Sequence, residues 1–206
     1  AIVQIADGVK VSTAAAHGTT GNWLIDPTDF TIASGLGVQT GSGIGATTLQ
    51  NALSTTDVTI ATSAIDTGGE LGDINVNSAV SWSTNKLTLS AHNNININAM
   101  MDGGAAGKLS LRFGQATADG GSSTYNVNAP VNLAAGPNFS TQLGSTGPLK
   151  NYPVITAMGE QGSTSGTDFQ GINGGLAANY VMGSNIDASA TPGRGAGAGL
   201  VHMMVN

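Results

Sequence analysis

The sequence predicts an all-β solenoid, in which short strands stack in parallel from coil to coil. One set of strands shares an alternation of aliphatic residues and asparagine: Ile74-Asn75-Val76-Asn77, Ile95-Asn96-Ile97-Asn98 and Tyr125-Asn126-Val127-Asn128. A second set interleaves with the first: Val58-Thr59-Ile60, Leu87-Thr88-Leu89 and Leu109-Ser110-Leu111. The step from Ile74 to Ile95 is 21 residues, and the step from Leu87 to Leu109 is 22. A period in the low twenties, made of strands and turns, is typical of a solenoid.

The alternation within each strand predicts which side chains face the core. A strand of three or four residues cannot bury an apolar row alone, whereas stacked parallel strands lay each aliphatic residue on its equivalents. The alternate positions then form an outward polar ladder, because stacked amides hydrogen-bond along a column. The six residues of this predicted ladder are Asn75, Asn77, Asn96, Asn98, Asn126 and Asn128. The alternative is a sandwich of ordinary hairpins in which asparagine only marks turns.

Composition limits the class of protein. Of the 206 residues 40% are hydrophobic, but only 4% are aromatic and 9% charged, and 31 are glycine. So few charges disfavour a helical enzyme domain, while the patterned aliphatic strands disfavour disorder. The net charge is −6 and the six Lys and Arg are scattered along the chain, so no nucleic-acid partner is expected. Cysteine is absent, which excludes disulfides and thiolate metal sites.

The N-terminal part of the chain is predicted to hold strands separated by loops of small residues. Residues 1–11 alternate as a strand broken at Asp7-Gly8, and the chain opens directly on it, as a fragment of a longer protein would. No signal peptide and no apolar stretch long enough to span a bilayer are visible. Asp26-Pro27 marks a turn before a short strand at 30–32. The apolar rhythm of residues 47–53 favours one or two helical turns over one end of the coils.

From residue 57 the predicted strands follow closely, with glycine-rich corners between them. The strands are expected at 57–62, 73–82, 86–91, 94–100 and 108–113. The corners are expected at Gly68-Gly69, Asp102-Gly103-Gly104 and Asp119-Gly120-Gly121, where glycine supplies backbone angles that other residues resist.

Three stretches in this order resemble the exoprotein repeats of the filamentous haemagglutinin family. They are GNWLIDPTDFTI at 21–32, LQNALSTTDVTIAT at 49–62 and GDINVNSAVSWSTNKLTLSAHNNININAMM at 72–101. The similarity covers roughly residues 20 to 135. It implies a right-handed parallel β-helix in a large secreted or cell-surface bacterial protein, exported by two-partner secretion through an outer-membrane transporter. The alternating strands alone predict only a strand solenoid.

The C-terminal part is expected to continue the same solenoid. We expect β-helix repeats over residues 1–135 and their continuation over 136–206, because residues 152–191 resemble the GLUG-type repeat that follows such helices in many exoproteins. Leu176, Tyr180 and Ile186 would then turn inward. From Pro192 the sequence departs from the family pattern, with a run of Gly and Ala in place of the usual Trp and Phe.

Residues of chemical interest give no coherent catalytic or metal site. The loop 103–108 (GGAAGK) superficially resembles a phosphate-binding loop, but Leu109 stands where Ser or Thr would bind magnesium. His17, His92 and His202 have no metal-ligand spacing. Asp66, Glu70 and Asp73 are interpreted as solvated corner charges, the alternatives being a glycosidase-type acid pair or a calcium site. Trp23, Phe30, Trp82 and Phe113 are expected to fill the core, with sugar stacking as the alternative.

The sequence therefore predicts no enzyme, no catalytic residue, no metal and no cofactor. It favours a structural or interaction segment of an adhesin or matrix fibre, located outside the cell and not embedded in a membrane. Its expected partners are glycans, a host or matrix surface, further copies of itself and the transporter. The alternatives are a carbohydrate-active enzyme of the polysaccharide lyase or glycosidase type, and a passive spacer without a ligand.

Overall fold

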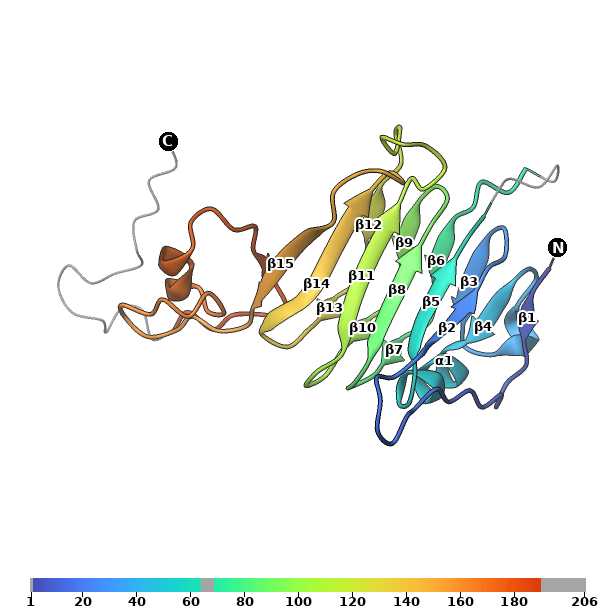
Figure 1. Cartoon of the computed structure of the whole chain (residues 1–206), viewed down its shortest axis with the longest axis horizontal. Coiled ribbons are helices and arrows are strands. Elements are labelled where there is room, and N and C mark those ends of the chain that lie inside the picture. The colour runs from blue at the N-terminus through green and yellow to red at the C-terminus, as the bar shows by residue number, and fades with distance from the viewer. Residues whose placement is uncertain (1, 64–68, 190–206) are drawn as a thin grey trace.

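The computed structural model describes residues 2–63 and 69–189 of the chain (Figure 1). Three sheets are present in that part, which we call sheets A, B and C. Sheet A has the order β1 (Gln4–Ile5), β4 (Gly43–Gly45), β3 (Phe30–Ala33), β6 (Ile74–Val76), β9 (Ile95–Ile97), β12 (Tyr125–Val127). Sheet B has the order β16 (Val181–Met182), β15 (Lys150–Ile155), β14 (Gly136–Leu143), β11 (Lys108–Phe113), β8 (Lys86–Ser90), β5 (Asp57–Ala61), β2 (Asn22–Ile25). Sheet C has the order β13 (Val131–Asn132), β10 (Met101–Asp102), β7 (Val80–Ser81).

The middle of the chain is a stack of coils in which each coil gives one strand to each sheet. The successive coils are β5-β6-β7, β8-β9-β10 and β11-β12-β13, and β14 begins the next. Each of these strands pairs in parallel with its equivalent in the neighbouring coil. Ile74 lies opposite Ile95, and Leu87 lies opposite Leu109. The predicted stacking of the two strand sets is therefore confirmed.

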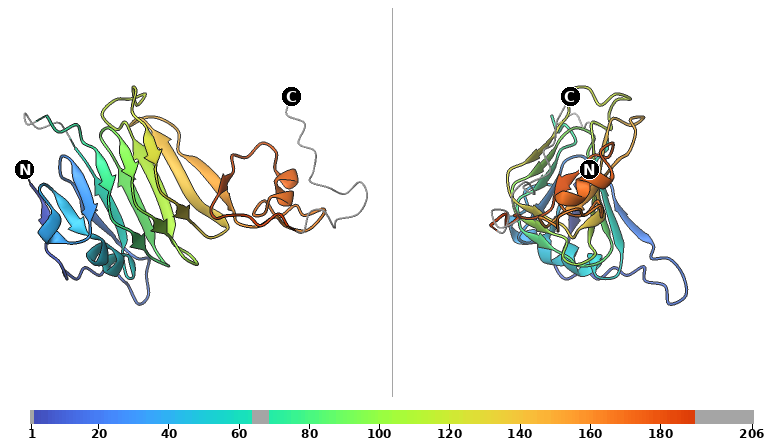
Figure 2. Two further views of the ribbon diagram at one scale, coloured as in Figure 1. Left: turned by 180° about the vertical axis from the view of Figure 1, so that it is seen from behind. Right: turned by 90° about the vertical axis from the view of Figure 1, so that its left-hand side faces the viewer.

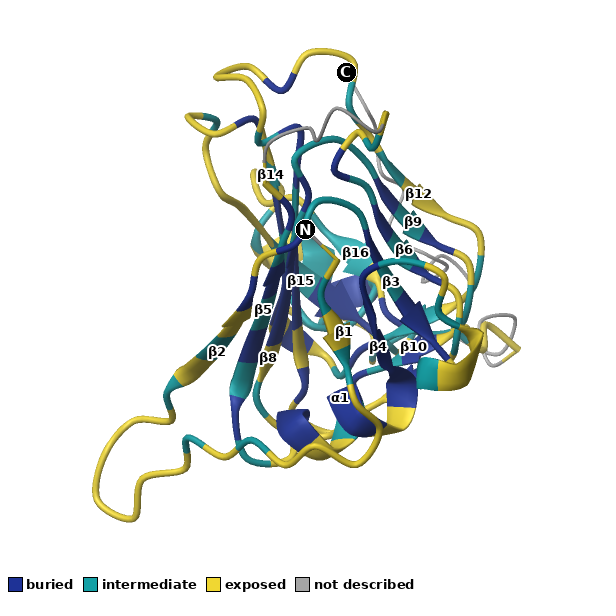
Figure 3. Cartoon of the chain, turned by 90° about the vertical axis from the view of Figure 1, so that its right-hand side faces the viewer, coloured by how far each residue is buried: buried dark blue, intermediate teal, exposed yellow. Residues whose placement is uncertain are grey.

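The core runs along the inside of the stack, between sheets A and B (Figure 3). Aliphatic side chains from equivalent positions form columns. Ile74 and Ile95 in one column and Leu87 in another are fully buried. Phe30, Trp82 and Phe113 are also buried in this core, and Trp23 packs against it half-buried. The prediction that the aromatic residues fill the core is therefore confirmed.

The prediction of a pure all-β fold is wrong, because the chain also contains helices. Helix α1 (Ala46–Leu53) and the short 3-10 helices η1 (Leu36–Val38) and η2 (Gln170–Gly174) give a mixed α and β chain with three sheets of mainly parallel strands. Leu49, Ala52 and Leu53 share one face of α1 and are buried, since positions i, i+3 and i+4 lie together on a helix. The helical turns predicted at 47–53 are therefore present as α1, between strands of the sheets.

Sheet B also departs from a continuous parallel stack at its C-terminal end. Strand β15 pairs antiparallel to β14, and β16 then pairs parallel to β15. The segment between β15 and β16 lies beyond the end of the stacked strands (Figure 2). Leu176 in this segment is 70% exposed, so its predicted inward orientation is wrong, whereas Tyr180 and Ile186 are half-buried.

Candidate functional site

The outer face of sheet A carries a column of stacked asparagine side chains. The register places Asn75, Asn96 and Asn126 opposite one another on β6, β9 and β12. Asn96 Nδ2 donates to Asn75 Oδ1 at 2.9 Å, and Asn126 Nδ2 donates to Asn96 Oδ1 at 2.8 Å. Their side chains point outward because the alternate residues of these strands are in the core. The structure thus brings three of the six predicted ladder residues together, one from each coil.

A second column lies just after the ends of the same strands. Asn98 Nδ2 donates to Asn77 Oδ1 at 2.9 Å, and Asn128 Nδ2 donates to Asn98 Oδ1 at 2.8 Å. The backbone holds this column in step, since Asn98 N–H donates to Val76 O and Asn128 N–H to Ile97 O, both at 2.9 Å. All three side chains of this column are exposed. We call the two columns together the amide ladders.

The amide ladders are polar, uncharged and directional. In each amide–amide hydrogen bond the Nδ2 group donates toward the N-terminal coil, so among the described residues Asn126 and Asn128 end the columns with Oδ1 atoms that accept no hydrogen bond. Asn75 and Asn77 end them at the other side with Nδ2 groups that find no acceptor there. A ladder of this kind offers donors at one end and acceptors at the other to a glycan or a further strand.

A further side-chain network holds the same coils in register, and sequence reasoning missed it. Asp29 Oδ1 accepts from Gly72 and Asp73 N–H at 2.6 and 2.8 Å. In the next coil Asp73 Oδ1 accepts from Asn94 N–H at 2.9 Å, and Asn94 Oδ1 then accepts from Thr124 N–H at 2.8 Å. The available signal was an Asp or Asn immediately before three of the sheet A strands, β3, β6 and β9, since these side chains commonly accept from nearby backbone N–H groups.

Two of the acidic residues considered as a catalytic or calcium cluster, Glu70 and Asp73, accept hydrogen bonds from side chains of neighbouring coils. Thr28 Oγ1 donates to Glu70, and Asp73 Oδ1 also accepts from Asn93 Nδ2 at 2.8 Å. Asp66 lies outside the described residues. Within residues 2–63 and 69–189 there is no group of three or more His, Asp or Glu side chains that could hold a metal ion.

Three of the six basic residues, which are scattered along the sequence, come together on one face in the fold. Lys86 on β8 lies opposite Lys108 on β11, and Arg112 follows on β11 on the same face. Their neighbours Leu87, Leu109 and Leu111 fill the core, so the three cations are on the outer face of sheet B. Register brings Lys86 next to the other two, although it is more than twenty residues away from them in sequence.

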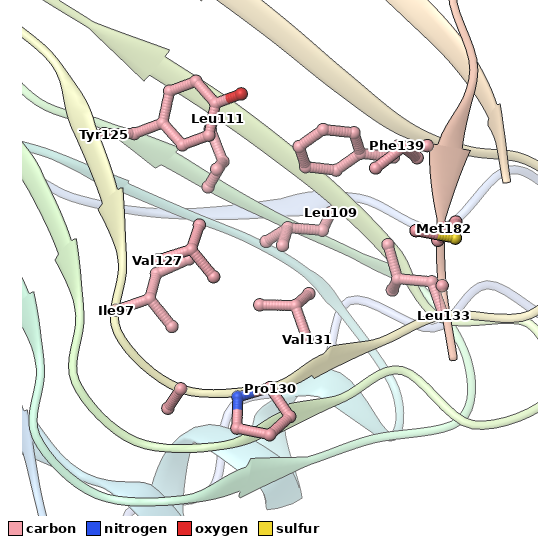
Figure 4. A pocket seen from close by; sticks show the side chains of 13 residues that line it. Ile97, Leu109, Leu111, Tyr125, Val127, Pro130, Val131, Leu133, Phe139 and Met182 are labelled. Atoms are coloured by element: carbon pink, nitrogen blue, oxygen red, sulfur yellow. The ribbon is translucent and has the colours of Figure 1, made fainter. Parts of the chain in front are cut away.

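An apolar cavity of about 280 Å³ lies at the C-terminal end of the core (Figure 4). Its walls include Ile97, Leu109, Val131 and Phe139, and β16 borders it with Met182. Tyr125 lies at its edge, where burial, together with the nearby Tyr152, raises the pKa of the Tyr125 hydroxyl. The cavity forms where sheet A ends at β12 while sheet B continues through β15 and β16.

Comparisons with protein-family models, with curated proteins and with solved structures gave no significant match to this chain. Among the helices of the described residues, none combines the length and the apolar character needed to cross a membrane.

Proposed function

We propose that this chain is a structural and interaction segment of a large bacterial protein that is secreted or held on the cell surface. In this proposal the stacked coils form a stiff scaffold without enzymatic activity, and the amide ladders face a glycan, a matrix surface or a neighbouring fibre. The observation that carries the proposal is the set of four amide–amide hydrogen bonds of 2.8–2.9 Å that join three successive coils. The resemblance to filamentous haemagglutinin repeats adds the expectation of export through an outer-membrane transporter.

The ladders suit recognition because their geometry is fixed before a ligand arrives. Each amide is held by its neighbour in the column, and the backbone beneath it is fixed by parallel pairing. Pre-organised groups lose little conformational entropy on binding, so repeated weak hydrogen bonds add up along an extended ligand. The absence of charge on these six side chains favours polar neutral ligands, which glycan hydroxyl groups provide.

A glycan array tests the adhesive part of this proposal. The wild-type chain is expected to bind a subset of neutral glycans, and the triple variant Asn77→Ser, Asn98→Ser, Asn128→Ser is expected to lose this binding while keeping its circular dichroism spectrum. The matched control is Thr59→Ser on the outer face of sheet B, which leaves both columns intact. Binding that is unchanged in the triple variant, or no glycan binding by the wild-type chain, contradicts the adhesive role.

Self-association is proposed to use the end of sheet A at β12. This strand pairs only with β9 among the described residues, and Val127 on it is exposed. Free strand edges pair readily with other strands, and a charged side chain blocks such pairing. We therefore expect concentration-dependent association in analytical ultracentrifugation that Val127→Lys abolishes. The control Leu71→Lys, at an equally exposed position outside the strands, is expected to leave association unchanged.

A further inference from the structure

The outer face of sheet B concentrates positive charge on a chain whose net charge is −6. Lys86 and Lys108 occupy directly opposite positions on neighbouring parallel strands, which lie about 4.8 Å apart. Arg112 lies four residues beyond Lys108 on the same strand and face, about 13 Å away along it. We call Lys86, Lys108 and Arg112 the cation triad; β8 and β11, which carry it, run side by side in Figure 1.

The cation triad has one carboxylate from the described strands of sheet B beside it, that of Asp57, and so keeps a local excess of positive charge. Among the described residues none of its three members takes part in an ion pair. Asp57 lies next to Lys86 in the register, but its carboxylate accepts the backbone N–H of Lys86 at 2.7 Å. Like charges directly opposite each other on neighbouring strands are destabilising, so a bound anion between Lys86 and Lys108 relieves a repulsion that the fold itself maintains.

The triad borders a shallow hollow with a floor of hydroxyl and amide groups. The hollow has a volume of about 170 Å³, and Ser110, Ser140, Asn138 and Asn151 line it together with the cation triad. Ser140 Oγ donates to Ser110 Oγ at 3.0 Å, which fixes this part of the floor. Arg112 Nε is buried beside it and finds no acceptor among the described residues. A buried N–H without a partner is costly, so this group marks a place where an acceptor is missing.

We propose that the outer face of sheet B binds an acidic polysaccharide, with the anionic groups of the polymer on the cation triad and its hydroxyl groups on the floor of the hollow. Carboxylate and sulfate groups share the chemistry that Lys and Arg recognise, and both accept hydrogen bonds from a guanidinium. The floor supplies hydroxyl and amide partners for sugar hydroxyls, and the one aromatic residue of the lining, Phe139, is buried in the core and does not offer its ring to a base for stacking. A nucleic acid is further disfavoured because its dense charge meets three cations on an otherwise acidic chain.

Surface plasmon resonance with the full chain immobilised tests this proposal. Polygalacturonate, dextran sulfate, neutral dextran and duplex DNA are passed over the chain at low and at physiological salt. We expect salt-sensitive binding of polygalacturonate or dextran sulfate, or of both, and none of neutral dextran. Binding of only one acidic polymer identifies its carboxylate or sulfate as the preferred group. Tighter binding of DNA than of either acidic polysaccharide, equal binding of neutral dextran, or no binding overturns the proposal.

Charge-neutral variants locate the site. The triple variant Lys86→Gln, Lys108→Gln, Arg112→Gln is expected to lose at least about tenfold in affinity for the acidic polysaccharide, as the loss of three ion pairs would give. Lys10→Gln, on the exposed segment that precedes β2, is the matched control and should bind as the wild-type chain does. If the triple variant is not folded, Lys108→Gln alone is measured and a loss of about threefold is expected. Unchanged binding in the folded variant overturns the proposal. This site stands apart from the amide ladders, whose triple serine variant should retain acidic-polysaccharide binding.

Discussion

The stacked coils and the segment that follows β15 are held together in different ways. In the coils, side-chain hydrogen bonds join residues one coil apart: Asn96 bonds to Asn75, 21 residues away, and Asn126 bonds to Asn96, 30 residues away. Between residues 157 and 180 of the later segment, side-chain hydrogen bonds join residues no more than five apart. Asp168 accepts from Ser163 and Ser165, five and three residues away, and the Tyr180 hydroxyl donates to Gly175 O, also five residues away.

This difference teaches where cooperativity resides in the molecule. A contact between coils is repeated in the next coil, so each coil stabilises its neighbours and a defect in one is transmitted along the stack. A locally bonded loop opens without disturbing the rest, because few of its contacts involve distant residues. We therefore expect substitutions in the coils to change global stability, and substitutions in the later segment to change local opening only.

The largest effect is expected from Ile95→Ala, which breaks a core column in the middle of the stack. Ile95 is fully buried between Ile74 and Tyr125, so truncation leaves a cavity that the neighbouring coils cannot close. We expect a loss of about 2–5 kcal/mol of unfolding free energy in urea denaturation.

The control for this variant is Leu176→Ala in the later segment, where the side chain is exposed. It should change the unfolding free energy by less than about 0.5 kcal/mol. Similar losses in the two variants would mean that the two regions unfold as one unit, contrary to the comparison.

A smaller effect is expected from Asn96→Ala, which interrupts the first amide column at its centre. The substitution removes the donor to Asn75 and the acceptor of Asn126 together, and it leaves both partners with an unpaired amide group. We expect a loss of about 1–2 kcal/mol in the same denaturation experiment. Asn128→Ala removes one terminal bond only and should cost about half as much. Equal losses would show that the columns do not act as continuous ladders.

In the later segment Asp168→Ala is expected to act locally. Asp168 accepts from Ser163 and Ser165 hydroxyls at 2.7 and 2.6 Å and from Gly171 N–H at 2.6 Å. We expect amide hydrogen exchange over residues 159–174 to accelerate about tenfold, as the loss of a charged hydrogen bond would give. Exchange in β8 and β11 should not change. An equal acceleration in those strands would contradict local opening.

The same loop should respond to pH in a defined direction. Partial burial raises the pKa of Asp168, but the hydrogen bonds from Ser165, Ser163 and Gly171 outweigh it, so the net pKa is lowered. A lowered pKa in the folded state means that the carboxylate stabilises the loop above the unfolded pKa of about 3.9 and that this stability is lost below it. Exchange over 159–174, corrected for its intrinsic pH dependence, should therefore rise as the pH falls below about 4. Asp168→Asn is the control and should show no such rise.

The sequence predicts the coils well because their physics is repetitive. Two sets of strands recur with nearly the same spacing in sequence, and this spacing determines which residues stack. It directly gives the pairs Ile74 with Ile95 and Leu87 with Leu109. The amide columns follow from the same register, since a side chain that alternates with a core residue must face outward. Corners such as the one at Gly120, with a φ of 83°, follow from the backbone angles that only glycine adopts easily.

Features that depend on three-dimensional neighbours could not be read from the pattern. The antiparallel turn into β15 reverses the strand direction without changing the alternation of side chains, so periodicity does not reveal it. Helix α1 is visible only as a short apolar rhythm between longer strand patterns. The cation triad needs the register itself, because Lys86 and Lys108 become neighbours only once β8 and β11 are paired.

The smallest effect is expected from Lys108→Gln, which tests whether stacking in register also carries a cost. Stacking that aligns favourable pairs such as Asn75 and Asn96 must also align Lys86 with Lys108. Removing one of the two charges should raise the unfolding free energy by a few tenths of a kcal/mol at low salt, because like charges no longer face each other. The gain should disappear at about 1 M salt, where the screening length falls to about 3 Å. Lys10→Gln, outside the sheets, should show no salt-dependent gain. A loss of stability in Lys108→Gln would mean that packing of the lysine side chain stabilises the coil by more than its charge destabilises it. The alignment of Lys86 with Lys108 would then carry no net cost.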